Sequence, residues 1–351
     1  MRLRDFPCRD TAVDLGSRTA RVHVRGRGVV AVTPSVLAVC ARTGRCLATG
    51  HQALAMRERT PAGVRFSWPF EGGVPVEDEP ARRLLTRLLY EAHHRRHLAN
   101  PRIAVAVPSQ ITDVQQHALA NTLDAAGARQ VTLVPTPLAA ALGAGLPPDR
   151  PRAVMVIDLG AVVTDIAVMS MGQIVSARTV RLGGRDLDAA IVGHVRRTRG
   201  VLIGDESAAE AKARIAAGAH RDEGVLVEGR DAADGLPRPV LLGAADIGAA
   251  VTAPLEEIFD AVQGVLQRCT PEMVRDLSTG GVALTGGGAR FPSLAALVRA
   301  QTGLPARVAG DPGEAVVLGT AAFLEHTPVM VRHRRHRPDR RRGFLTAPRS
   351  L

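Results

Sequence analysis

The sequence has 351 residues, of which 46% are apolar and only 3% are aromatic. This length is enough for two domains of ordinary size, with a core of small aliphatic side chains. The scarcity of aromatic residues argues against a nucleic-acid platform that stacks bases on aromatic rings. The formal net charge is +11, but eight arginines lie beyond His326, so much of the positive charge is in the C-terminal tail.

Neither the cysteines nor the apolar runs indicate a secreted or membrane-spanning chain. The four cysteines show neither metal-ligand nor disulfide-framework spacing. No apolar run approaches the roughly 20 residues of a membrane span, and the N-terminal residues lack the apolar segment of a signal peptide. We therefore expect a cytoplasmic protein whose membrane contact, if any, is peripheral.

An internal repeat begins near the N-terminus. Residues 13–24 and 157–168 each read as an apolar strand, an Asp-Leu-Gly turn and a second, alternating strand. Residues 28–39 and 173–180 add a further β-rich stretch to each copy. Two copies of one supersecondary plan predict a duplicated domain with a cleft between the halves. We call the copies the first and second Asp-Leu-Gly hairpins.

Helices and strands are predicted in alternation along the rest of the first half. A helix over 80–98 has its apolar residues on one face, with Asp78 as a candidate cap. The other predicted elements are a strand over 103–107, a helix over 112–126, a strand over 131–134, a helix over 137–144 and a Pro-rich linker over 146–151.

The second half continues the same pattern. Its predicted elements are helices over 186–198, 207–217, 245–267, 291–301 and 312–324, a hairpin within 224–242 and a strand over 281–285. Such alternation favours an α/β fold. Beyond Pro328 the Arg- and His-rich tail is expected to be disordered.

Three glycine turns at strand ends are candidates for phosphate binding. Asp14 and Asp158 each end a predicted strand, where the turn offers backbone N–H groups to phosphate oxygens. Their carboxylates are expected to face each other across the cleft and to hold Mg²⁺ through its waters. The third turn, Gly286–Ala289, follows a strand and precedes a helix, so its backbone can approach a ligand closely.

Two further residues have alternative interpretations. Lys212 is the only lysine in an otherwise Arg-rich chain, which indicates either a need for a compact ammonium group or a solvated helix face. Gln115 forms the pattern of a capping box with Thr112. Its amide can equally orient a water molecule, and both roles stay open.

Several longer stretches follow the order and spacing of a known family. They are residues 26–36, 107–114, 137–141, 183–191, 202–204, 278–288 and 315–321. Through them residues 13–324 resemble the actin, Hsp70 and sugar-kinase superfamily, and specifically the bacterial MreB/Mbl proteins. The stretches 111–114 and 202–204, and the absence of a C-terminal peptide-binding domain, favour MreB over Hsp70.

The resemblance implies an actin-like, duplicated ribonuclease H-like fold of the α/β class, with a nucleotide cleft between two domains. Domain I would span 1–147 with a small insert at about 32–72. Domain II would span 148–325 with an insert at about 184–242, and a basic tail would cover 326–351. The resemblance also implies an ATP-binding, filament-forming cytoskeletal protein that lies under the cell membrane and guides cell-wall synthesis and cell shape.

The resemblance also assigns roles by position. The first phosphate loop would comprise Asp14, Leu15, Gly16, Ser17, Arg18 and Thr19, and the second would include Asp158, Gly160, Ala161, Val162 and Thr164. Gly286, Gly287, Gly288 and Ala289 would face the adenosine, with Ala209, Glu210 and Lys212 on its base and ribose side. Asp14 and Asp158 would organise Mg²⁺ through water, and Gln115, Asp158 and Thr164 would be catalytic, with Gln115 positioning the attacking water. Such a site would be at most a slow ATPase coupled to polymerisation.

The second phosphate loop departs from the family pattern. Ala161, Val162 and Val163 replace two glycines and a threonine, and Ala209 stands where the family has Glu. Valine is poor at positive φ, and its branches can crowd a phosphate. An alternative hypothesis is therefore a pseudo-ATPase of actin fold, which binds nucleotide weakly or not at all and regulates or co-assembles with a conventional MreB.

The expected partners follow from the resemblance and from the tail. They are further copies of the chain, a second MreB-type protein, and the membrane proteins of cell-wall synthesis. The stretch Arg332–Arg342 would attract an anionic membrane surface, at about 1 kcal/mol per residue, or act as a nonspecific polycation. A weakly apolar tip at Leu98-Ala99 is a second candidate membrane contact. Nucleic acid is a less favoured partner, and a small-molecule kinase is disfavoured because no acceptor-site acid stands out.

Overall fold

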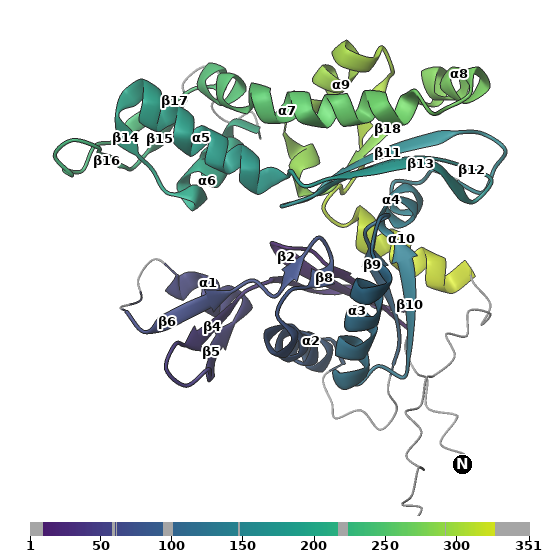
Figure 1. Cartoon of the computed structure of the whole chain (residues 1–351), viewed down its shortest axis with the longest axis horizontal. Coiled ribbons are helices and arrows are strands. Elements are labelled where there is room, and N and C mark those ends of the chain that lie inside the picture. The colour runs from purple at the N-terminus through teal and green to yellow at the C-terminus, as the bar shows by residue number, and fades with distance from the viewer. Residues whose placement is uncertain are drawn as a thin grey trace, which may run out of the picture.

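The computed structural model describes residues 10–57, 60, 62–93, 101–146, 148–216, 224–291 and 293–326. Within these residues the chain forms two α/β halves, the first below and the second above in Figure 1. The basic tail, the Leu98-Ala99 tip and the end of the helix predicted over 80–98 lie outside the described residues.

Each half is built on a five-stranded sheet, and the two sheets share one plan. The first has the order β10-β9-β1-β2-β3 and the second β13-β12-β11-β18-β19. The strands of the first sheet are β1 (Thr11–Leu15), β2 (Thr19–Val24), β3 (Gly28–Pro34), β9 (Arg102–Val107) and β10 (Gln130–Pro135). Those of the second are β11 (Val154–Leu159), β12 (Thr164–Ser170), β13 (Gln173–Val180), β18 (Val282–Thr285) and β19 (Ala306–Val308).

The register confirms the predicted duplication. In both sheets the first three strands are antiparallel and the fourth and fifth continue in parallel. Asp14 on β1 lies opposite Arg21 on β2, and Asp158 on β11 lies opposite Asp165 on β12. The two aspartates therefore occupy matching positions at the ends of matching strands.

Helices cover the sheets and close two separate aliphatic cores. In the first half α2 (Asp78–His93) turns Leu84, Leu85 and Leu88 towards the sheet, and α3 (Asp113–Ala125) packs beside it. The second half carries α5 (Gly184–Arg199), α7 (Ala244–Leu266), α8 (Pro271–Gly280) and α9 (Leu294–Thr302). The apolar spacing that predicted α7 puts its buried stripe into the second core.

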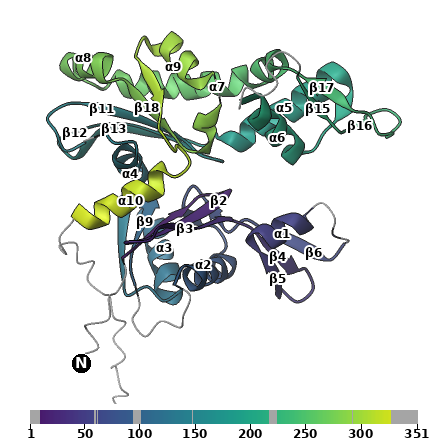
Figure 2. The ribbon, with the colours of Figure 1, turned by 180° about the vertical axis from the view of Figure 1, so that it is seen from behind.

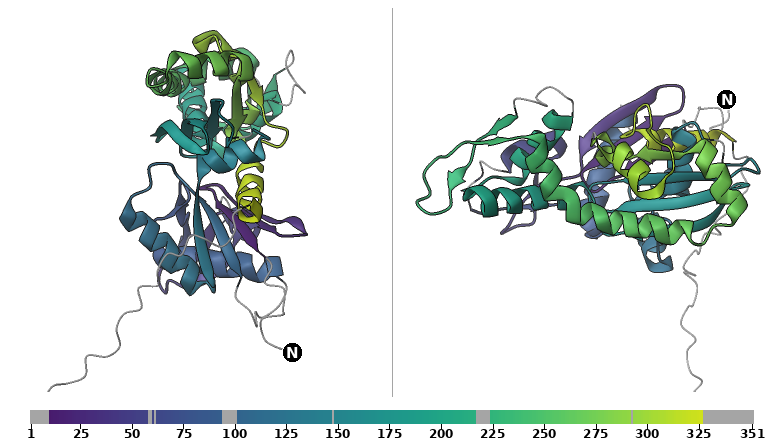
Figure 3. Two further views of the ribbon diagram at one scale, coloured as in Figure 1. Left: turned by 90° about the vertical axis from the view of Figure 1, so that its right-hand side faces the viewer. Right: turned by 90° about the horizontal axis from the view of Figure 1, so that it is seen from above.

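Two helices of small residues join the halves. Both α4 (Thr136–Gly143) and α10 (Ala315–His326) lie between the two sheets, as the views in Figure 2 and Figure 3 show. A shared cluster includes Ala104 of the first sheet, Val156 of the second and Val316 of α10. A Cβ on Gly319 would lie only 1.7 Å from the carbonyl oxygen of Ala139, so this helix pair depends on glycine for its close approach. The domain division at residue 147 stays a prediction, since α10 contacts both halves.

A small insert projects from each half on the same side of the molecule (Figure 1). The first insert contains β4 (Leu37–Cys40), β5 (Cys46–Thr49), α1 (Gly50–Met56) and β6 (Val64–Ser67), followed by the short hairpin of β7 (Phe70–Glu71) and β8 (Val74–Pro75). The second contains β14 (Val201–Leu202), α6 (Asp205–Ala216), β15 (Val225–Val227), β16 (Arg230–Asp231) and β17 (Val240–Leu242). Because both inserts lie on the same side of the molecule, they can contact each other across the cleft between the halves.

Some local predictions were wrong or incomplete. Asp78 is the first residue of α2 and not its cap, and its carboxylate accepts a hydrogen bond from Thr122 Oγ1 at 3.2 Å. The predicted hairpin within 224–242 is confirmed by the pairing of β15 with β17. Helices α1 and α8 were not predicted, because short helices carry weak periodicity. No helix in the described ranges has both the length and the apolar character of a membrane span.

Candidate ligand-binding cleft

A cavity of about 570 Å³ opens between the halves, a volume within the usual range of small-molecule sites. All three predicted glycine turns contribute to its lining. The predicted residues that line it are Asp14, Gly16, Ser17, Arg18, Thr19, Asp158, Gly160, Ala161, Ala209, Glu210, Lys212, Gly286, Gly287 and Gly288. Those that do not are Leu15, Gln115, Val162, Thr164 and Ala289.

The turns of the two Asp-Leu-Gly hairpins have the same local geometry. A Cβ on Gly16 would lie 2.6 Å from the carbonyl oxygen of Thr19, and one on Gly160 would lie 2.8 Å from that of Val163. None of residues 160–163 has a positive φ. Valine at 162 and 163 therefore causes no backbone strain there, and Gly160 is needed for close approach and not for a left-handed conformation.

The two facing aspartates are held in a buried, carboxylate-rich place. Burial raises the pKa of Asp158 to about 7, with a hydrogen bond from Thr285 Oγ1 at 2.7 Å opposing the shift and the charges of Asp165 and Asp14 adding to it. Burial likewise raises the pKa of Asp14 to about 6, and the charge of Arg21 opposes that shift. Arg21 Nη1 lies 3.6 Å from Asp14 Oδ2. A bound cation would favour the ionised form of both carboxyls.

At the third glycine turn the backbone lines the cleft directly, because its glycines have no side chains. Gly286 has a φ of 81°, and a Cβ there would lie 2.4 Å from the carbonyl oxygen of Leu159. In the following short 3₁₀ helix, η1 (Gly287–Arg290), Gly287 is open, because a Cβ added to this residue would have no atom of the described residues within 4 Å. Only glycine combines this conformation with this proximity at 286, while 287 offers space to a ligand.

Helix α6 presents one polar face to the cavity. Ala209, Glu210 and Lys212 line the cleft as predicted, and Glu206, one turn before Glu210, lines it as well. Lys212 Nζ lies 2.5 Å from Asp188 Oδ1 and donates to the carbonyl oxygen of Gly184 at 3.0 Å. The only lysine is therefore an anchored cation beside the cavity and not a solvated residue.

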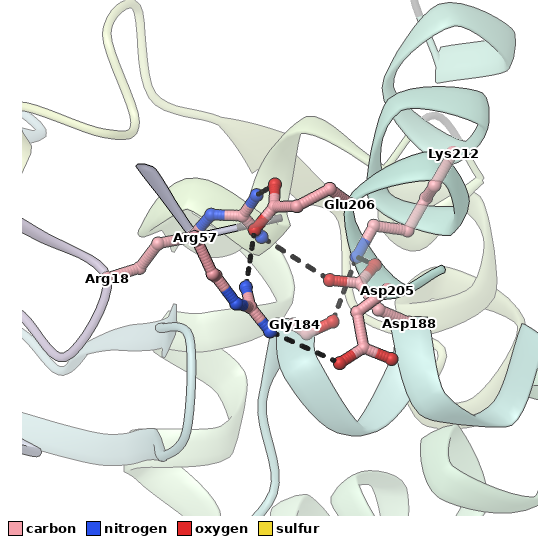
Figure 4. Close-up of polar contacts among 7 residues, drawn as sticks. All are labelled: Arg18, Arg57, Gly184, Asp188, Asp205, Glu206 and Lys212. Carbon is pink, nitrogen blue, oxygen red and sulfur yellow. Dashed lines mark hydrogen bonds and ion pairs between the residues drawn. The ribbon is translucent and has the colours of Figure 1, made fainter. Parts of the chain in front are cut away.

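Ion pairs join the two halves at the rim of the cleft (Figure 4). Arg18, from the first hairpin, lies 2.9 Å from Glu206 Oε2 and 3.4 Å from Asp188 Oδ2. Arg57, which follows α1, lies 3.1 Å from Glu206 Oε1 and 3.8 Å from Asp205 Oδ2. Both arginines belong to the first half and all three acids to the second, so these contacts link the halves.

Trp68, the only tryptophan, lies at this rim. The guanidinium carbon of Arg57 is 5.1 Å from its ring centre, and that of Arg185, from α5, is 5.2 Å away. One cation therefore comes from each half. Both distances are within the range of cation–π contacts.

The second hairpin contacts the first half through the apolar side chain of Val163 and the carboxyl group of Asp165. The side chain of Val163 lies 3.3 Å from the position of a Cβ on Gly72, in the turn between β7 and β8. The same turn donates from Gly72 N to Ser17 Oγ at 2.8 Å, so it touches both hairpins. Ser109, before α3, donates to Asp165 Oδ1 at 3.4 Å.

Two of the predicted catalytic residues have structural partners away from the cavity. Gln115 forms the capping box of α3, with its Oε1 accepting from Thr112 N at 3.0 Å. Thr164 is fully buried and donates to the carbonyl oxygen of Leu182 at 2.7 Å. In this conformation neither side chain reaches the cleft, so their catalytic roles remain predictions.

Sequence reasoning missed several residues that line the cleft. They are Arg21, Gly72, Gly73, Ala106, Thr136, Asp165, Gly184, Arg185, Leu187, Asp188, Glu206, Ala213, Arg290, Phe291, Gly313 and Val316. The internal repeat could have predicted two of them as cleft residues, because Arg21 and Asp165 occupy the same position in the two hairpins. The others depend on contacts between distant segments.

Two matching α/β halves, joined by a helix pair and separated by a cleft lined with glycine turns, define an actin-like fold. The fold agrees with solved actin-like proteins: the crystal structure of MreB5 of Spiroplasma citri bound to ADP superposes with a TM-score of 0.86 at 28% identity, covering 91% of this chain and 97% of that one. The MamK double helical filament matches with a TM-score of 0.76 at 19% identity, which supports the fold alone.

The particular family follows from sequence comparison. A family model described as MreB/Mbl protein matches residues 8–332. The cell shape-determining protein MreB of Escherichia coli (strain K12) is 37% identical over 325 residues, covering 90% of this chain and 93% of that protein. The cell shape-determining protein Mbl of Bacillus subtilis (strain 168) is 33% identical over 320 residues, covering 91% and 96%. The chain belongs to the MreB/Mbl family.

Proposed function

We propose that this protein is a bacterial actin that binds ATP in the cleft and assembles into filaments that take part in determining cell shape. The observation that carries the proposal is the convergence of three glycine turns on one cavity of about 570 Å³. Family membership supports it, as do the similar MreB5 structures bound to ADP and to AMPPNP, at 28% and 27% identity.

The residues present fit a nucleotide with Mg²⁺. Gly287 leaves open space at the third turn, and Asp14 and Asp158 supply two carboxylates at the ends of matching strands. Mg²⁺ favours oxygen ligands and keeps several waters, so these carboxylates would hold it through water. When bound, the ion would neutralise phosphate charge. The chain itself would orient the phosphates with backbone N–H groups of the two hairpin turns.

Hydrolysis would be slow in the conformation described. The Gln115 amide is engaged in its capping box, and it would have to leave Thr112 to position a water molecule. The pseudo-ATPase alternative is not favoured. One of its motives was that valine is poor at positive φ, but none of residues 160–163 has a positive φ.

Self-assembly, attachment to the inner face of the cell membrane, and contact with cell-wall synthesis proteins or a second MreB-type protein are part of the proposal. They rest on family membership, and the Arg-rich tail is the proposed membrane element. Binding of liposomes by the full chain and by a chain ending at His326 would test that role. Equal binding by both would contradict it.

Calorimetric titration with Mg·ATP tests the site. We expect micromolar binding by the wild-type protein and loss of binding in Asp158→Ala, followed by nucleotide-dependent sedimentation. Asp124→Ala, an exposed change on α3, is the matched control and should bind like the wild type. No wild-type binding at millimolar ATP would overturn the proposal, and equal binding by Asp158→Ala would overturn the site assignment.

A further inference from the structure

Among the described residues, five cationic side chains line the cleft, and the hydrogen-bond partners of their N–H groups differ. They are Arg18, Arg21, Arg185, Lys212 and Arg290. Arg18 and Lys212 contact acids of the second half, and Arg185 lies over Trp68. Arg290 donates to Asp311 Oδ1 at 3.3 Å and is 61% exposed. Each of these four has a partner of its own.

Arg21 is different. Its side chain is only 16% exposed, and its Nε is buried with no hydrogen-bond partner among the described residues. Its contact with Asp14, at 3.6 Å, is an ion pair longer than a hydrogen bond. A buried donor without an acceptor is unfavourable, so this arrangement adds little to the stability of the fold in the absence of a ligand.

The guanidinium of Arg21 is placed where three parts of the cleft meet. It extends from β2 and lies beside the carboxylate of Asp14. Its positive charge also opposes the rise in the pKa of Asp158 that burial causes. Its Nη2 lies 3.3 Å from the position of a Cβ on Gly313, in the loop before α10. That loop accepts a hydrogen bond from Gly286 N through Pro312 O at 2.7 Å, which ties it to the third glycine turn.

We infer that Arg21 is a ligand for the phosphate chain of the nucleotide. A guanidinium has five N–H donors in a planar fork, which suits oxyanions and most of all phosphate. In the second hairpin the matching residue is Asp165, so the two halves do not both supply this cation. In the second loop, Val163 stands where the family has a threonine, so the hydroxyl group of that threonine is not available to contact a phosphate. Arg21 would supply a phosphate contact in its place. The inference rests on the proposed nucleotide binding.

The test compares ligands that differ in their phosphates. Full-length wild type, Arg21→Gln and Arg87→Gln would be titrated calorimetrically with adenosine, Mg·ADP and Mg·ATP. Loss of a charge-assisted hydrogen bond should weaken ADP and ATP binding by Arg21→Gln about ten- to a hundredfold. Adenosine binding should change less than about twofold, since it has no phosphate. Arg87→Gln, at an arginine of α2 that is 58% exposed and does not line the cleft, should stay within about threefold for all ligands.

The outcomes separate this inference from the proposed function. If the wild type binds ADP and Arg21→Gln binds it equally well, the role of Arg21 is overturned while nucleotide binding stands. If the wild type binds neither ADP nor ATP, both are overturned. If adenosine and ADP weaken equally, Arg21 acts through the fold, which also overturns the inference.

A second variant covers the case in which Arg21→Gln does not fold. Arg21→Lys keeps the charge beside Asp14 but offers a point charge in place of the planar fork. We expect it to fold, as judged by circular dichroism, and to bind ADP about three- to tenfold more weakly than the wild type. Unchanged ADP affinity in Arg21→Lys, together with an unfolded Arg21→Gln, would overturn the inference.

Discussion

The two Asp-Leu-Gly hairpins have one backbone plan, yet they cross the cleft with opposite chemistry. The first reaches the second half through the charged side chain of Arg18, which pairs with Asp188 and Glu206. The second reaches the first half through the apolar side chain of Val163, which lies against the turn at Gly72. The two hairpins therefore share the backbone geometry of the turn, whereas the side chains with which they contact the opposite half differ.

The same contrast holds at the base of each turn. Asp14 faces a cation, Arg21, whereas Asp158 faces a second carboxyl, Asp165. The pKa of Asp158, about 7, is accordingly higher than that of Asp14, about 6, although burial is the largest cause of both shifts. The half with the cation can hold an anion, and the half with two carboxyls is better suited to a cation.

The largest effect should come from the feature that the hairpins share. In Gly16→Ala and Gly160→Ala the new Cβ would lie 2.6 Å and 2.8 Å from a backbone carbonyl oxygen of the same turn. We expect each change to lower the free energy of unfolding by about 2–3 kcal/mol, since the turn must open to relieve the overlap. Chemical denaturation measures it.

Gly248→Ala, within α7, is the matched control, because no atom lies within 4 Å of its Cβ position. It should be neutral or stabilising by up to about 1 kcal/mol, since alanine favours the helix. If Gly16→Ala were destabilising and Gly160→Ala were not, the two turns would not be structurally equivalent.

The raised pKa values of Asp158 and Asp14 predict that the free energy of unfolding depends on pH, with an effect of intermediate size. The pKa of Asp158 is raised from 3.8 to about 7, so the native state binds more protons than the unfolded state between these values. Without nucleotide, the stability of the wild type should therefore fall as the pH rises from about 4 to about 7. In Asp158→Asn a large part of this fall should be lost, because an amide does not bind a proton in this pH range.

Thermal or urea unfolding at several pH values, with Asp124→Asn as the exposed control, measures this difference. Asp14→Asn should reduce the fall less, because the pKa of Asp14 is raised only to about 6. Identical pH profiles for the wild type and Asp158→Asn would show that Asp158 is not protonated in the native protein at mildly acidic pH.

The two crossings should respond differently to salt. Val163→Ala removes apolar contact with the Gly72 turn and should lower the free energy of unfolding by about 1 kcal/mol, independently of ionic strength. Denaturation at low and high salt measures this change. A salt-dependent loss in Val163→Ala would indicate that this crossing is not apolar in character.

The ionic crossing should give the smallest effect. Arg18 is 45% exposed, so Arg18→Ala should cost less than about 1 kcal/mol, and the difference should vanish at high salt. Fluorescence of Trp68, the only tryptophan, reports the rim directly and should shift at low salt as the two halves move apart at the rim. Arg65→Ala breaks the Arg65–Glu77 pair, which lies within the first half, and should leave the emission unchanged. Equal shifts in both variants would contradict a link between the halves.

Much of this molecule could be predicted from local pattern. The repeat, the α/β alternation and the three glycine turns depend on short-range periodicity and on turn chemistry, and all are present in the structure. The capping box at Thr112 and Gln115 was one of two open interpretations, and it is formed. Short elements such as α1 and α8 were missed because a few residues do not establish a period.

Local sequence features predict where the backbone turns and which residues end the strands, because these depend on glycine, on alternation and on neighbours along the chain. Contacts between residues far apart in the chain depend on the tertiary structure. They include the pairs Arg18–Glu206 and Lys212–Asp188, and the buried N–H donor of Arg21 that has no acceptor among the described residues. Those partners are set by how the two halves pack on α4 and α10, and a side chain's charge does not reveal which distant residue it will face.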